Sequence, residues 1–190
     1  MKYSILLLLT LSLAFNSKSQ DSAIALSQFE TFTGQANKIL KTELQEVVGQ
    51  DSRVVTVFKS TDLISGASVQ AVRIGYLSTL NMPELINPQA LYLDFSELDT
   101  VINVLTHFLI ETENSRPVAD VQLSYTTSND IVLSCSYNRG SGTWRFHLWK
   151  RYKHLHTPIP GTTITYFNKR RIVQLVEDLK TAKGITMAKP

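Results

Sequence analysis

Cysteine is nearly absent from this chain, because Cys135 is the only one in 190 residues. A single thiol cannot form an intramolecular disulfide, which excludes disulfide-stapled scaffolds and leaves a hydrophobic core to hold the fold. Glycine and proline are also sparse, with eight and six residues, and charged residues make up 18%. These values exclude collagen-like and disordered chains. A chain of this length can bury a sufficient core as one domain.

Catalytic motifs are missing as well. The sequence has no G-x-S-x-G elbow, no G-x-x-x-x-G-K-[ST] phosphate loop, no G-x-G-x-x-G fingerprint and no H-E-x-x-H zinc helix. Their absence does not exclude an enzyme whose site carries no short motif. The sequence therefore predicts no catalytic residue and no cofactor, and it favours a non-catalytic role.

The long hydrophobic run of the chain lies at its N-terminus. Lys2 precedes an uncharged, mostly apolar stretch of about 13 residues, and Ser17 and Ser19 follow it. This run is shorter than the roughly 20 residues that a spanning helix needs. The order is typical of a signal peptide, residues 1–19, cleaved before Gln20. We expect a soluble product that is secreted or periplasmic; the alternative is a buried N-terminal helix of a cytosolic protein.

The positive charge of the chain is small once this segment is removed. The full sequence has 19 basic and 16 acidic residues, and loss of Lys2 and Lys18 leaves 17 against 16, a net charge of +1. A general attraction to nucleic acid or anionic membranes is therefore not predicted. Only local clusters can carry such a function.

Apolar residues recur at helical spacing between Ser22 and Gly49. This spacing predicts an amphipathic helix that ends at Gly49, with residues 35–48 as its firmer part and Gly34 as a point of bending or breakage. Two further helices are predicted over 96–113 and 168–182. The first would begin with a capping box between Ser96 and Asp99, and the second with Asn168 as its N-cap.

Runs of β-branched and aromatic residues predict the strands, and they are separated by turn signals. The predicted strands are 53–59, 67–78, 118–127, 130–138 and 143–153, with short strands at "ALYLDF" and "TTITYF". Several strands thus precede a helix twice. We expect an α+β domain over residues 20–190, in which mostly antiparallel sheet packs against two or three helices.

The two predicted halves, residues 50–115 and 116–185, are alike where a short strand ends in Phe95 or Phe167 and a helix follows. Either a duplication or shared strand-to-helix chemistry explains this likeness. The element order is similar to that of single-strand nucleic-acid-binding folds of the whirly type. The likeness is in element order alone, and the predicted export argues against a nuclear or cytosolic role, so no family follows from it.

The histidines and the cysteine have plain explanations. His154 and His156 form an H-x-H pair, but a metal site needs three or four ligands and no Cys or carboxylate cluster lies near them, so no metal site is predicted. Cys135 lies in an apolar strand, where a thiol behaves as a small hydrophobe. A catalytic thiol would need a histidine and an orienting partner brought close by the fold.

The segment "WRFHLWKRYKHLH", residues 144–156, is the richest in binding chemistry. As a strand it places Trp144, Phe146, Leu148 and Lys150 on a face that begins apolar and is directed to the core. The other face mixes cations with an aromatic ring, which suits an anion and a stacked base or sugar. The alternative is a solvated outer face whose basic residues protect the sheet.

A second cationic cluster opens the last predicted helix, where three positive charges oppose the helix dipole. Glu177 and Asp178 near the other end are also reversed, so we expect neighbouring groups or a ligand to compensate. Together the two clusters give one candidate anion-binding surface: Arg145, Trp149, Arg151, Lys153, Lys169, Arg170 and Arg171.

Three function classes follow from the sequence. The favoured one is an exported binding or interaction module whose basic-aromatic surface docks an anionic partner, such as a polysaccharide, a lipid headgroup, a nucleic acid or an acidic protein. The alternatives are an exported enzyme with an unmarked site and a structural or assembly component of the cell envelope.

Overall fold

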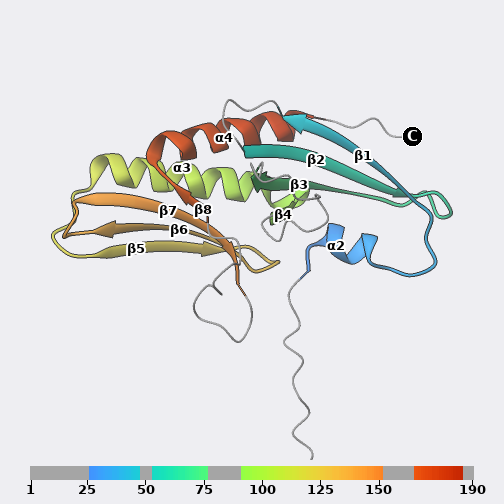
Figure 1. The fold of residues 1–190 in the computed structure, drawn as a ribbon, viewed down its shortest axis with the longest axis horizontal. Helices are drawn as coiled ribbons and strands as arrows, with labels where there is room; N and C mark the ends of the chain where they lie inside the picture. The colour runs from blue at the N-terminus through green and yellow to red at the C-terminus, as the bar shows by residue number, and fades with distance from the viewer. Residues whose placement is uncertain (1–25, 48–52, 77–90, 152–164, 186–190) are drawn as a thin grey trace, which may run out of the picture.

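The computed structural model describes residues 26–47, 53–76, 91–151 and 165–185, in which four strands followed by a helix occur twice (Figure 1). A short helix, α2 (Gln28–Thr33), comes first. The first unit consists of β1 (Leu40–Val47), β2 (Arg53–Asp62), β3 (Ser68–Tyr76), β4 (Leu91–Asp94), the 3-10 turn η2 (Phe95–Glu97) and α3 (Leu98–Asn114). The second unit consists of β5 (Val121–Thr126), β6 (Ile131–Asn138), β7 (Thr143–Lys150), β8 (Thr165–Phe167) and α4 (Lys169–Gly184).

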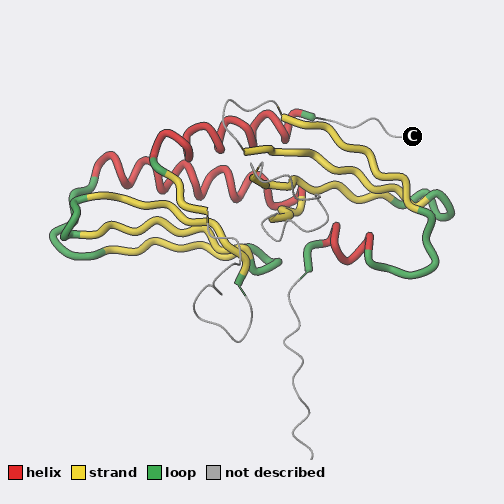
Figure 2. The backbone as a smooth tube through the Cα atoms, viewed as in Figure 1, coloured by secondary structure: helices red, strands yellow, loops and turns green. Residues whose placement is uncertain are grey.

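Each unit forms its own four-stranded antiparallel sheet, in which the strands lie in chain order (Figure 2). Short described turns connect β2 with β3, β5 with β6, and β6 with β7. Between β2 and β3, the Asp62 side chain accepts hydrogen bonds from Ile64 N–H and Ser65 Oγ, and Gly66 has φ 72°. Asp130 and Gly142 adopt positive φ in the turns before β6 and β7. These conformations suit Gly and Asp better than other residues.

Helices α3 and α4 lie side by side across one face of both sheets (Figure 1). They are antiparallel, since Lys169 at the start of α4 pairs with Glu113 at the end of α3, and Lys183 at the end of α4 pairs with Asp99. Apolar residues from both helices and both sheets form one continuous core. Each fully buried Leu or Phe in it contributes about 1.5–3 kcal/mol of transfer free energy.

Helix α2 packs on the opposite face of the first sheet. Its Phe29 ring stacks on Tyr92, with ring centroids 5.5 Å apart, and contacts the edge of Phe58 at 5.7 Å. A capping box fixes its start: Ser27 Oγ accepts the Glu30 N–H, and the Glu30 carboxylate accepts the Ser27 N–H. The first sheet therefore has helices on both faces, whereas no helix of the described chain covers the outer face of the second sheet.

The α+β class predicted from the sequence is confirmed, but the helix predicted over 35–48 is wrong. That segment contains β1, all eight residues of which pair with β2. Leu40 and Leu44 are four residues apart, a spacing that places them on one face of a helix and equally on one face of a strand. Pairing with β2 decides between the two periods. Among the described residues of this stretch, Gln28–Thr33 alone are α-helical, and Gly34 ends α2 as its C-cap.

Most other element predictions are confirmed. The strands over 53–59, 67–78, 118–127, 130–138 and 143–153 and the helices over 96–113 and 168–182 match observed elements within a few residues. The capping box predicted between Ser96 and Asp99 is wrong, because the chain makes the η2 turn there and α3 begins without a side-chain cap. Since β1 belongs to the first unit, that unit begins at Leu40 rather than near residue 50. The predicted signal peptide lies outside the described residues.

Candidate functional site

The outer face of the second sheet carries a row of three large polar or aromatic side chains from β7. Arg145, His147 and Trp149 are two residues apart, so they share the face opposite to Phe146 and Leu148, which are buried in the core. Arg145 is exposed, and His147 and Trp149 are half-buried. We call these three the Arg–His–Trp row; it spans about 13 Å at the rise of a β-strand.

Smaller side chains of β6 lie opposite this row. The register pairs Ser136 with Arg145, Ser134 with His147, and Val132 with Trp149. Large side chains on β7 therefore stand beside small ones on β6. The arrangement follows directly from the alternation of the two sequences.

His147 is the titratable centre of the row. Its Nε2 lies 3.3 Å from Ser136 Oγ, and its ring meets the Trp149 ring edge-on with centroids 6.5 Å apart. Burial lowers the pKa of His147, and the nearby charge of Arg145 lowers it further. His147 is therefore neutral at pH 7, and an anion bound beside Arg145 would favour its protonation.

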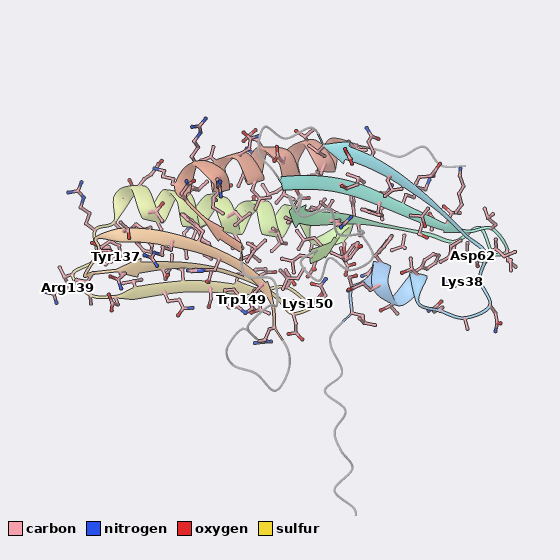
Figure 3. The ribbon with its side chains drawn as sticks, viewed as in Figure 1. Lys38, Asp62, Tyr137, Arg139, Trp149 and Lys150 are labelled. Carbon is pink, nitrogen blue, oxygen red and sulfur yellow. The ribbon has the colours of Figure 1, made fainter. Side chains whose placement is uncertain are left out.

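The start of α4 lies at the Arg145 end of the row. Strand β8 pairs with β7 so that Phe167 is opposite Phe146, and α4 begins directly after Asn168. The β6–β7 turn and the connection from α3 to β5 lie at the same end, where Arg139 N–H donates to Asp120 Oδ1 at 2.7 Å (Figure 3). We call this region the cationic end; its exposed cations are Arg116, Arg139, Arg145, Lys169, Arg170 and Arg171.

Acidic residues of the cationic end compensate only part of its charge. Glu111, Glu113 and Asp120 lie there against six cations. Lys169 Nζ is 2.8 Å from Glu113 Oε1, and Asn168 Oδ1 accepts the Arg171 N–H at 3.0 Å. Glu113 of the neighbouring helix thus compensates Lys169, one of the three cations that oppose the dipole of α4, and among the described residues the cations of this end outnumber its acidic residues.

The other predicted cations lie elsewhere. Arg151 follows β7 at the far end, about 20 Å from Arg145 along the strand, and its Nη2 is 2.7 Å from Asp130 Oδ1. Lys153 lies outside the described residues, as do His154 and His156. The strand register therefore places Arg145 at the same end of the sheet as Lys169, Arg170 and Arg171, whereas Arg151 lies at the opposite end.

Arg116, Arg139 and His147 belong to the cationic end or the row but were not among the site residues predicted from the sequence. Arg116 and Arg139 lie in connections whose ends meet only after both sheets have formed. His147 carried a usable signal, because it alternates with Arg145 and Trp149 on the face that was already singled out.

A second feature is an open cleft of about 520 Å³ between α2 and the first sheet. Asp94 lies in its wall, and burial raises the pKa of this carboxyl group, with hydrogen bonds acting in the opposite direction. Both Asp94 oxygens accept the Gln28 N–H, at 2.9 and 3.1 Å. The carboxylate thus holds the first turn of α2, a structural task that leaves little capacity for chemistry.

Other candidate chemistry has structural explanations. Cys135 is fully buried and burial raises its pKa to about 12, so it remains a thiol and packs as a small apolar group. In the described part of the chain, no group of three metal-ligating side chains occurs and no helix is long and apolar enough to cross a membrane.

Comparison of the chain with protein-family models, with curated proteins and with solved structures finds no match. The fold and surface define the class of this protein: an α+β protein with two four-stranded sheets, in which a sheet face that no described helix covers ends in a cluster of cations.

Proposed function

We propose that the protein is an exported binding module that holds an anionic polysaccharide along the Arg–His–Trp row and the cationic end. The observation that carries the proposal is the alignment of Arg145, His147 and Trp149 on a sheet face that no described helix covers. Cations for acidic groups and an aromatic ring for a sugar face therefore lie in one line.

The geometry suits an extended chain better than a small compact ligand. The row lies on a sheet surface and not in an enclosed cavity, and exposed Arg170 and Arg171 at the start of α4 lie at its Arg145 end. A polymer with repeated acidic groups can follow this path. Trp149 offers a large, rigid contact area that loses little conformational entropy on binding.

The predicted export favours a polysaccharide among anionic polymers, because such chains are abundant outside the cytosol. The N-terminal order of Lys2, an apolar run and Ser17 and Ser19 supports export. N-terminal sequencing of the protein from its native host should find a chain that begins at or near Gln20. An intact Met1 in the cytosolic fraction would contradict this part of the proposal.

Titration with three polymers tests the binding itself: heparin, polygalacturonate and neutral dextran. We expect the two anionic polymers to bind with an affinity that falls steeply with salt, and dextran not to bind. Quenching of Trp149 fluorescence should report binding. In W144F, a matched control on the other face of β7, the quenching should persist, and in W149F it should disappear. Equal binding of dextran would refute the proposal.

A further inference from the structure

Strand β1 forms an edge of the first sheet and pairs only with β2 among the described strands. It is eight residues long, contains no proline, and its register with β2 continues without a bulge. Edge strands of this length usually carry such interruptions because they attract other strands. The edge of β1 is therefore suited to accept a further strand.

The hydrogen bond that extends the β1–β2 ladder by one pair shows which groups of β1 face outward. Leu63 N–H donates to Ile39 O at 2.8 Å, so odd-numbered residues of β1 bond to β2. The N–H and C=O groups of Leu40, Thr42 and Leu44 then point away from the sheet. The Leu44 side chain is 61% exposed, which is high for a leucine on a strand.

We infer that β1 pairs antiparallel with β1 of a second copy of this chain, around a two-fold axis at Thr42. In this register Lys41 is opposite Glu43 of the partner subunit, and the symmetry repeats this contact. Leu40 is opposite Leu44 of the partner subunit, also twice. The outward-facing residues would exchange about six main-chain hydrogen bonds, and the two sheets would become one of eight strands.

Charge selects this register over its neighbours. A two-fold axis perpendicular to the sheet keeps every side chain on its own face. In each permitted register, the residue at the axis is opposite the same residue of the partner subunit. The neighbouring registers therefore have the axis one residue earlier or one residue later than Thr42. One step in either direction places Lys41 opposite Lys41 of the partner subunit, or Glu43 opposite Glu43 of the partner subunit. Like charges directly opposite each other are unfavourable.

The charges are free to exchange partners. In the single chain Lys41 Nζ lies 2.8 Å from Glu43 Oε1, and the two side chains are 58% and 41% exposed. An exposed pair of this kind contributes little on its own. Replacing it by two contacts between subunits costs little and adds the pairing of Leu40 with Leu44.

Sedimentation equilibrium of three variants tests the inference. Wild type should be a dimer. K41E and E43K each place like charges opposite each other, so each should raise the dimer dissociation constant about tenfold or more. When the two variants are mixed, every opposing pair becomes Glu with Lys, and a heterodimer should form. Thr42→Pro removes an outward N–H that β2 does not use, and it should give a folded monomer.

Circular dichroism of each variant checks that the fold is intact. A monomeric wild type, a dimer that K41E leaves unchanged, or a mixture of K41E and E43K that fails to associate would each overturn the inference. The mixture keeps the test decisive even if Thr42→Pro does not fold.

Discussion

The contact between Glu30 and Lys150 ties α2 to the second sheet, and Glu30→Gln tests its contribution. Glu30 Oε2 lies 2.9 Å from Lys150 Nζ and also accepts the Ser27 N–H at 2.8 Å. The two charged side chains are 27% and 15% exposed. Glutamine keeps an oxygen for the Ser27 N–H, so the substitution removes the charge and preserves the helix cap.

The expected loss in the free energy of unfolding of Glu30→Gln lies between two known cases. Exposed ion pairs contribute about 0–1 kcal/mol, and breaking a fully buried pair costs about 3–5 kcal/mol because one charge is left without a partner. This pair is mostly buried but not dry, so we expect Glu30→Gln to lower the free energy of unfolding by about 2 kcal/mol. The double variant E30Q/K150M should lose less, because no ammonium group is then left unpaired.

Urea unfolding followed by circular dichroism measures the free energy of unfolding of E30Q and of E30Q/K150M. The pH dependence of this free energy provides a second test of the ion pair. Burial alone would raise the pKa of Glu30, but hydrogen bonds from Ser27 and the contact with Lys150 outweigh it and hold the pKa below its usual value. Because the folded-state pKa of Glu30 is lowered, the ionised carboxylate stabilises the fold at pH values above its unfolded-state pKa. This stabilisation is lost as the pH falls through the folded-state pKa. Equal stability of wild type and E30Q at pH 7, or a difference that persists in strong acid, would refute the reasoning.

Two further predictions concern α4 and the Arg–His–Trp row. Asn168→Ala removes the side-chain acceptor of the Arg171 N–H and should lower the free energy of unfolding by about 1 kcal/mol. Asn168→Asp keeps an acceptor oxygen and should retain the stability of the wild type. Equal urea midpoints for wild type and N168A would show that the cap does not stabilise α4. His147→Gln should remove part of the pH dependence of the free energy of unfolding. Because the folded-state pKa of His147 is lowered, neutral His147 favours folding above about pH 6.5, and this advantage is lost as the pH falls toward the folded-state value. Between pH 7 and pH 5, the melting temperature of H147Q should fall less than that of wild type. An equal fall of the two melting temperatures would contradict this prediction.

The strands and the two long helices could be predicted from the sequence because their patterns are local. The β6 and β7 runs are rich in β-branched and aromatic residues, and α3 repeats apolar residues on one face. β1 could not be predicted in this way. Its sequence, LKTELQEV, contains good helix formers, and only pairing with β2 makes it a strand.

The candidate site shows the same division between local and long-range information. Alternation along β7 predicts that Arg145 and Trp149 share a face. It does not predict that Arg151 meets Asp130, because that contact depends on the turn before β6. The reversed charges of α4 did indicate compensation by a neighbour, but the identity of Glu113 depends on the antiparallel packing of α3 and α4.

The proposed anion-binding surface lies at the cationic end, and two charge-matched variants test this position. R145E/R170E reverses two cations of the cationic end, and K180E/K183E reverses two exposed cations near the other end of α4. Heparin affinity is measured for both over a range of salt concentrations. We expect R145E/R170E to lose at least about tenfold in affinity and to show a weaker salt dependence, while K180E/K183E stays close to wild type. Equal losses in the two variants would contradict this position, because binding would then follow net charge and not this surface.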